Sequence, residues 1–311
     1  MAFECRRKLA RGIDPIDSRP KPSGMTFEEC AEEYVSSHSS GWRSETHKEQ
    51  WTTSLRDYIN PLIGKTPVET INTDLVLKVL KPIWDSKPET ASRVRGRIEA
   101  VLDWAGAHKY RQGDNPARWR GHLKNLLPHK SKVRAVKHHE ALPYSELPGF
   151  LIKLRNLDNL SARALEFIIL TAARTGEVIE AKSAEVNSRV WTIPAERMKS
   201  GREHRVPLSA PALALLKLGQ DFLFQLRRGK PLSKSAIPMM LERMGLDVTV
   251  HGFRSTFRDW AAERTDFPNE VVEMALAHAV GDKTEAAYRR GDLFDKRRAL
   301  MDAWASFCLN K

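Results

Sequence analysis

The chain has 311 residues, more than a usual single domain, so its length favours two domains. Hydrophobic residues make up 41% and charged residues 29%, which is typical of a globular protein and excludes a disordered or fibrous one. Apolar runs such as 167–170 are too short to cross a membrane, and the basic residues 1–11 are not followed by the apolar run of a secretory signal. The three cysteines, Cys5, Cys30 and Cys308, form no CxxC pair, so we expect free thiols and no zinc ribbon.

The net charge of +12 is concentrated in one stretch of the chain. Residues 93–137 contain 12 basic and 3 acidic side chains, a net charge of +9. Such a field attracts a polyanion such as DNA or RNA. The alternative is a solvated helix face followed by a basic linker. The candidate nucleic-acid contacts are Arg93, Arg97, Lys109, Arg111, Lys130, Lys132 and Arg134.

The first half of the chain reads as a linker followed by a helical bundle. Residues 1–22 contain several X-Pro pairs, which disfavour a continuous helix. Thr26 and Glu29 have the spacing of a capping box that opens a helix. Residues 23–112 then predict a small bundle, in which Asn60-Pro61 ends the second helix and Arg97 lies off the apolar stripe of the fourth. The expected helices are 26–37, 44–59, 73–84 and 89–109.

A second domain is expected after a basic connection. Residues 113–140 have Gly, Pro and many basic residues with little periodicity, so we interpret them as an inter-domain linker. Residues 141–311 are mostly helical, with strands at 189–193 and 204–208 and Lys199 in the turn between them. The predicted fold is therefore mainly α with a small antiparallel sheet. The expected helices are 145–156, 161–181, 209–218, 233–244, 251–264, 269–278, 283–290 and 295–308.

The candidate chemistry lies in cationic side chains of the second domain. The chain has no P-loop, GxGxxG or HExxH motif, and His138-His139 has only Glu140 as a nearby carboxylate, which disfavours a metal site there. Arg174 follows an apolar run and must find a partner, which Glu177 three residues on could supply. The alternative for these two residues is a plain structural ion pair.

Further candidates come in two groups. His251 and Arg254 share one side of a helix, and Gly252 allows close backbone approach, which suits an anionic ligand. The alternative for His251 is a surface histidine that caps a helix. His278 closes a later helix, and Tyr288 lies beside two arginines that would favour its phenolate, although an amphipathic surface tyrosine is the alternative. Together these cations could surround one phosphodiester without a metal ion.

The order Arg174, Lys199, His251-x-x-Arg254, His278, Tyr288 resembles the active-site series of tyrosine recombinases. The segments 171–177 (TAARTGE), 197–209 (RMKSGREHRVPLS), 251–260 (HGFRSTFRDW) and 276–278 (LAH) are similar to those of prophage integrases of the satellite-phage type. The resemblance covers about residues 25–311. It implies a two-domain DNA clamp that cleaves and rejoins DNA through a 3′-phosphotyrosyl link, without metal, cofactor or ATP.

The resemblance also implies a role for each residue. Tyr288 would be the nucleophile, Arg174 and Arg254 would hold the phosphate oxygens, and Lys199 would be the general acid. His251 would accept a proton or bind the phosphate, and His278 would hydrogen-bond the phosphate. Glu177 would support the site from behind.

Partners follow from the same resemblance. They are double-stranded DNA at core or attachment sites and three further copies of the chain. The protein would be a monomer when free and a tetramer on DNA. A DNA-bending protein and a directionality factor are further expected partners, and the expected location is the bacterial cytoplasm, at the nucleoid. The closing helix carries an apolar stripe that we expect to dock on a neighbouring protomer, with packing on its own domain as the alternative.

Two departures from the family pattern leave other functions open. The chain begins in what resembles the tail of an arm-binding domain, and Ala181-Lys-Ser-Ala stands where a tryptophan is common. The alternatives are a catalytically silent DNA-binding relic of a prophage, an accessory DNA-binding protein, or a relaxing enzyme that uses the same chemistry.

Overall fold

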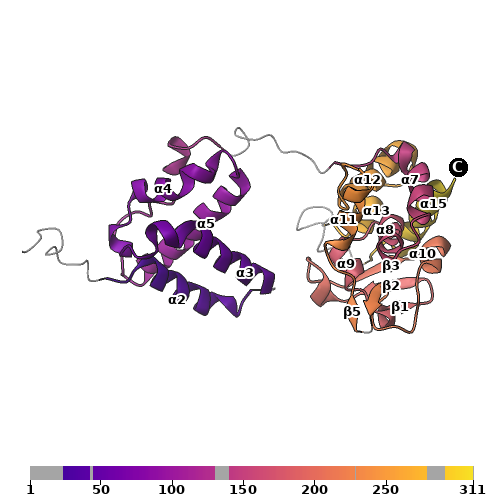
Figure 1. Ribbon diagram of the computed structural model, residues 1–311, viewed down its shortest axis with the longest axis horizontal. Coiled ribbons are helices and arrows are strands. Elements are labelled where there is room, and N and C mark those ends of the chain that lie inside the picture. Colours follow the sequence, from indigo (N-terminus) through magenta and orange to yellow (C-terminus); the bar gives the residue numbers. More distant parts are fainter. Residues whose placement is uncertain (1–23, 43–44, 130–139, 228, 279–290, 311) are drawn as a thin grey trace, which may run out of the picture. The chain divides into compact units, whose positions relative to one another are not determined.

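A computed structural model describes residues 24–42, 45–129, 140–227, 229–278 and 291–310. The chain divides into two compact units, residues 1–137 and 138–311, each with its own hydrophobic core (Figure 1). No helix within the described ranges is long and apolar enough to cross a membrane. The described cysteines, Cys30 and Cys308, are buried free thiols, as expected.

The first unit is a helical bundle, as predicted. The capping box at its start is confirmed, because Thr26 N donates to Glu29 Oε2 (2.8 Å) and Glu29 N donates to Thr26 Oγ1 (3.3 Å). Pro88 starts the longest helix of the unit at its first turn. The elements are α2 Phe27–Ser39, α3 Glu45–Ser54, η1 Leu55–Gly64, η2 Val68–Thr70, α4 Thr73–Trp84, α5 Pro88–Ala107 and η3 Leu123–Asn125.

Two expectations for this unit are wrong. The helical backbone does not end at Asn60-Pro61 but continues to Gly64 as the π-helix η1, which keeps Ile59 and Ile63 fully buried. The linker does not begin at residue 113, because the side chains of Ala117 and Leu123 are fully buried in the first core.

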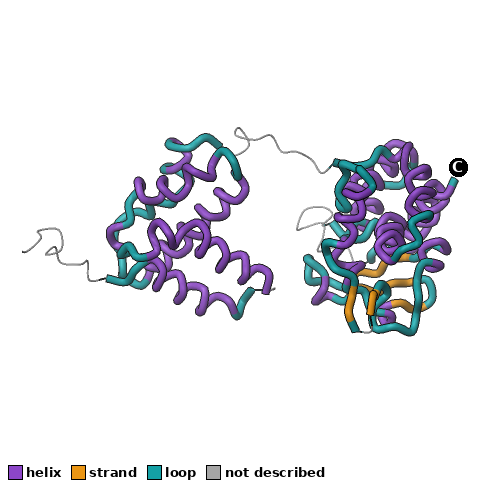
Figure 2. Tube along the Cα trace, viewed as in Figure 1, coloured by secondary structure: helices purple, strands orange, loops and turns teal. Residues whose placement is uncertain are grey.

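The second unit is mostly helical with small antiparallel sheets, as predicted. Its strands gather at one end of the unit (Figure 2). The three-stranded sheet has the order β1-β2-β3, with Ile193 opposite His204, and the two-stranded sheet β4-β5 was not predicted. The strands are β1 Val186–Asn187, β2 Val190–Ile193, β3 His204–Pro207, β4 Gln225–Arg227 and β5 Lys230–Pro231.

The helices of this unit pack around α8, which is buried along most of its length. The helix expected over 161–181 is broken, because Ala172 is left-handed (φ 50°) and a new helix begins at Thr175. The elements are η4 Tyr144–Glu146, α7 Leu147–Arg155, α8 Leu160–Thr171, α9 Thr175–Ile179, η5 Ser183–Glu185, η6 Ala195–Arg197, α10 Ala210–Ala214, α11 Ala236–Arg243, α12 Gly252–Arg264, α13 Asn269–Ala275 and α15 Phe294–Leu309.

The closing helix α15 packs on its own unit, so the expectation that it docks on a neighbour is wrong for this structure. Leu300, Met301, Trp304 and Cys308 are at most 1% exposed and belong to the core of the second unit. Trp304 Nε1 also donates to the carbonyl oxygen of Ile169 in α8 (2.8 Å). These four side chains leave no surface for a partner, and Phe307, the remaining residue of the stripe, is partly buried against the same core.

Candidate active site

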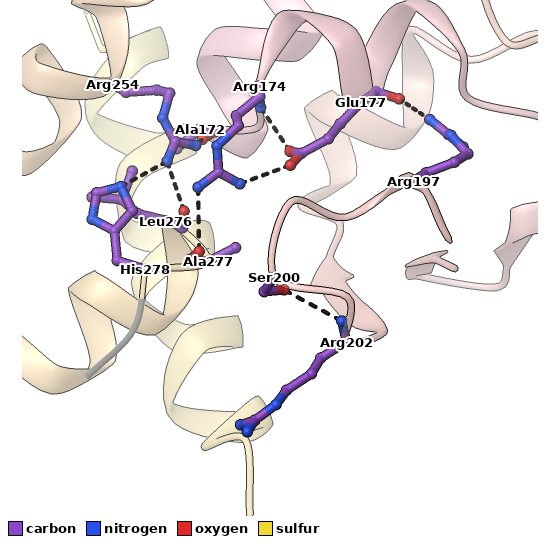
Figure 3. Close-up of polar contacts among 10 residues, drawn as sticks. All are labelled: Ala172, Arg174, Glu177, Arg197, Ser200, Arg202, Arg254, Leu276, Ala277 and His278. Carbon is purple, nitrogen blue, oxygen red and sulfur yellow. Dashed lines mark hydrogen bonds and ion pairs between the residues drawn. The ribbon is translucent and has the colours of Figure 1, made fainter. Parts of the chain in front are cut away.

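Arg174 stands at the break between α8 and α9, where it pairs with Glu177. Its Nη1 donates to Glu177 Oε1 and its backbone N donates to Oε2, both at 2.8 Å (Figure 3). The Glu177 side chain is 6% exposed and that of Arg174 is 27% exposed. Arg174 Nη2 donates to the carbonyl oxygen of Ala277 at 3.3 Å. The expected pair is therefore present, and the arginine keeps one edge open to solvent.

Arg254 approaches the same place from α12 and is almost completely buried, with 4% of its surface exposed. Its Nη1 donates to the carbonyl oxygen of Ala172, and its Nη2 donates to that of Leu276 at 2.6 Å. Burial, together with the charge of Arg174, lowers the pKa of Arg254 to about 10. The guanidinium therefore stays protonated at neutral pH, inside the protein and next to a like charge.

His278 completes this cluster at the end of α13. Its Nε2 lies 3.1 Å from Arg254 Nη2, and its Nδ1 lies 2.7 Å from Glu273 Oε2. A guanidinium can only donate and a carboxylate can only accept, so Nε2 accepts and Nδ1–H donates. Glu273 also accepts from Arg258 Nε at 2.7 Å. Burial alone would raise the pKa of Glu273, but these two hydrogen bonds keep it below its ordinary value.

Lys199 lies in the turn between β2 and β3, as predicted, and its side chain is exposed. The turn is closed by a hydrogen bond from Gly201 N to the carbonyl oxygen of Met198 (2.9 Å), and Gly201 has a positive φ of 67°. The Met198 side chain is 5% exposed and anchors the turn in the core.

His251 immediately precedes α12 and is exposed, one turn before Arg254. The expectation that Gly252 leaves room for a ligand is wrong. A Cβ at that position would lie 2.2 Å from the carbonyl oxygen of Glu140 and 3.0 Å from Ala141 Cα. Glycine is therefore required by the chain's own backbone, which passes over the start of α12.

The remaining expected residues divide into three groups. Tyr288, Lys130, Lys132 and Arg134 lie outside the described residues. Arg93 and Lys109 are exposed, as a nucleic-acid contact requires. Arg97 and Arg111 are 8% and 7% exposed, which corrects their expected surface positions.

The two buried arginines of the first unit have partners within that unit. Arg97 donates through Nη1 to Ser54 Oγ, and its guanidinium carbon lies 5.4 Å from the centre of the Trp51 ring. Arg111 Nη1 donates to the carbonyl oxygen of Asp114 at 3.2 Å. The position of Arg97 between apolar neighbours on α5 favours this burial.

Three residues near the site were not predicted. Glu273 holds His278, and Arg197 contacts the backbone of Glu177. His204, on β3, has its pKa lowered to about 4 by burial and then by the charge of Arg297. The only signal in the sequence is closeness to a candidate: Arg197 comes two residues before Lys199 and Glu273 five residues before His278.

Two family models match the chain, one in each unit. Residues 27–122 match the phage integrase central domain, and residues 146–292 match the phage integrase family. The chain is 31% identical to prophage integrase IntZ of Escherichia coli (strain K12) over 98% of this chain and 78% of that protein. It is 30% identical to the integrase of Enterobacteria phage P4 over 98% of this chain and 75% of that protein.

Solved structures have the same fold at low sequence identity. A lambda integrase tetramer bound to a Holliday junction aligns with a TM-score of 0.65 and 18% identity, covering 94% of this chain and 86% of that one. The Tn1549 transposon integrase (residues 82–397), in complex with circular intermediate DNA, aligns with a TM-score of 0.64 and 14% identity, covering 89% and 99%. From the sequence relatives and the shared fold together, the chain belongs to the phage integrase family.

Proposed function

We propose that this protein is a site-specific DNA recombinase that cleaves and rejoins double-stranded DNA through a 3′-phosphotyrosyl intermediate. One observation carries the proposal: Arg174 and Arg254 converge near His278, which contacts Arg254, while the carboxylate of Glu177 pairs with Arg174. This inner cluster has one more positive charge than negative charges. A phosphodiester carries one negative charge and has oxygens that guanidinium groups bind well.

The reaction is a transesterification, in which one ester bond to phosphorus forms as another breaks. The Tyr288 oxygen attacks phosphorus, the bond from phosphorus to the 5′-oxygen breaks, and the phenolic proton passes to His251. Lys199 gives a proton to the departing 5′-oxygen. Arg174 and Arg254 stabilise the charge that develops on the non-bridging oxygens, and His278, whose Nε2 accepts from Arg254 Nη2, orients that guanidinium instead of donating to the phosphate itself. A second 5′-hydroxyl then displaces the tyrosine, so the ester energy is conserved and ATP is not needed.

The DNA partner is proposed on the basic stretch and on the relatives. Arg93 and Lys109 are exposed on the first unit, in the stretch of highest positive charge, and would contact the phosphate backbone. Two of the similar structures are integrases in complex with DNA or a Holliday junction, one of them a tetramer. A tetramer on DNA in the bacterial cytoplasm, assisted by a bending protein and a directionality factor, is the assembly that we propose.

Covalent trapping tests the proposal. The wild-type chain should form a protein–DNA adduct on a nicked suicide substrate taken from the DNA that flanks the gene, and Tyr288→Phe should form none. Adduct formation by Tyr288→Phe would show that the nucleophile is wrong. Salt-sensitive DNA binding by the wild type without any adduct would favour the catalytically silent relic instead.

A further inference from the structure

Arg197 ties the Lys199 turn to the helix that carries Glu177. It is the last residue of η6, two positions before Lys199, and its side chain is 15% exposed. Its Nη2 donates to the backbone oxygen of Glu177 (Figure 3), and its Nη1 pairs with Glu185 Oε1. Both ends of the guanidinium fork are thus held, one by α9 and one by the segment before β1.

The carboxylate that receives Arg197 is itself fixed. The Glu185 side chain is 10% exposed, and its second oxygen accepts from Trp191 Nε1 at 2.9 Å. Trp191 is fully buried on β2, the strand that leads into the turn. The chain of contacts therefore runs from the sheet through Glu185 and Arg197 to Glu177, and from there through its carboxylate to Arg174.

A general acid on an exposed turn needs such a support. Proton transfer requires the donor within hydrogen-bond reach of the leaving oxygen, and a displacement of about 1 Å can cost about 100-fold in rate. The Lys199 side chain is exposed, so the backbone position of its turn sets where the amine can reach. Of the two residues before it, Met198 is buried and the Arg197 side chain is only 15% exposed.

We propose that Arg197 is a positioning residue that fixes the Lys199 turn relative to Arg174, and that it acts on the reaction through Lys199. This inference rests on the proposed function and extends it. Arg197 does not bind the phosphate, because both of its terminal nitrogens are engaged inside the protein.

The test changes the leaving group of the DNA. A substrate whose scissile phosphate has a 5′-bridging sulfur releases a thiolate, which needs no protonation because a thiol is far more acidic than an alcohol. On the ordinary 5′-oxygen substrate, Arg197→Lys should slow adduct formation about 10- to 100-fold. On the 5′-sulfur substrate the same variant should react within about threefold of the wild type, because general-acid catalysis is then dispensable. Lysine keeps the charge but cannot bridge two acceptors with a planar fork.

Matched variants separate the possible failures. Arg155→Lys alters the Arg155–Glu166 pair of the same unit, in which the Glu166 side chain is 6% exposed. The ratio of its rate to the wild-type rate should be the same on the two substrates. Glu185→Gln removes the negative charge that pairs with Arg197 and replaces one of the two acceptor oxygens by a donor, so it should show the same rescue as Arg197→Lys, to a smaller extent. Equal slowing of Arg197→Lys on both substrates, or no slowing on either, would overturn the inference.

The proposed function has its own controls in the same assay. Tyr288→Phe should form no adduct on either substrate, and Lys199→Met should be rescued by sulfur. If Lys199→Met is not rescued, its role as general acid is wrong and the inference about Arg197 falls with it. If Lys199→Met is rescued and Arg197→Lys is not, the function stands and Arg197 has only a structural role.

Discussion

Replacing Glu177 by glutamine tests whether the turn between α8 and α9, which carries Arg174, depends on a buried carboxylate. Glu177 accepts through one oxygen from the guanidinium and through the other from the backbone N of Arg174. A glutamine of the same shape has one acceptor oxygen and one NH₂ group, so a donor would face a donor on one side. The variant also removes the negative charge paired with Arg174, so Arg174 and Arg254 remain as two neighbouring positive charges.

The expected loss is about 2–3 kcal/mol in the free energy of unfolding of the second unit. A hydrogen bond to a charged group contributes about 1.5–3 kcal/mol, and breaking a buried ion pair by removing one partner costs about 3–5 kcal/mol. The expected loss lies below the cost for a fully buried ion pair because the Arg174 side chain is 27% exposed and water screens it. For a domain of this size the melting temperature should fall by about 4–12 °C.

The matched control is Glu180→Gln, one turn further along. Glu180 pairs with Lys234 at 3.2 Å, but the side chains are 45% and 73% exposed. Such a surface pair contributes at most about 1 kcal/mol. Urea unfolding of both variants gives the comparison. A loss for Glu177→Gln no larger than that of Glu180→Gln would refute the idea that the carboxylate holds the turn.

Three further predictions concern the basic helix, the closing helix and acid stability. Arg93→Glu should weaken DNA binding and lower the slope of log affinity against log salt by about 1. Arg97→Glu should instead unfold the first unit, because Arg97 is buried. Equal salt slopes and equal stability for the two variants would contradict this. Trp304→Ala should cost about 3–5 kcal/mol in thermal or urea unfolding of the isolated monomer, and an unchanged monomer with a weakened tetramer would instead favour docking on a neighbour. His204 has a folded pKa of about 4 against an ordinary 6.5, so its contribution to stability is complete above pH 6.5 and is lost as the pH falls towards 4, by about 3 kcal/mol. Unfolding of His204→Gln should therefore depend less steeply on pH between 6.5 and 4, and parallel curves would show that His204 is not the group concerned.

The sequence predicted contacts that are local and missed those that are made across the chain. The Arg174–Glu177 pair follows from a spacing of three residues, and it is present. The left-handed break at Ala172 could not be predicted, because alanine there is stabilised by a hydrogen bond from Arg254, 82 positions away. The burial of Arg97 likewise depends on Ser54, 43 positions earlier.

The sequence around this break predicts a continuous helix. Residues 161–181 have helical periodicity without a glycine or proline before Gly176, so no local signal marks Ala172. Left-handed alanine costs about 1 kcal/mol or more. Tertiary hydrogen bonds offset that cost only after α12 and α13 have packed, so the turn belongs to the folded unit and not to its sequence window.

The two arginines are therefore held by each other's turns. Arg254 donates to the carbonyl oxygen of Ala172, two residues before Arg174, while Arg174 donates to that of Ala277, next to the His278 that contacts Arg254. Ala172 and Ala277 both have positive φ, at 50° and 51°, so both carbonyls are aimed by strained backbone. Backbone oxygens orient the guanidiniums but bring no net negative charge to neutralise them. The cluster is thus fixed in position without a bound anion and carries one more positive than negative charge. These are the two conditions for electrostatic stabilisation of an anion with little reorganisation.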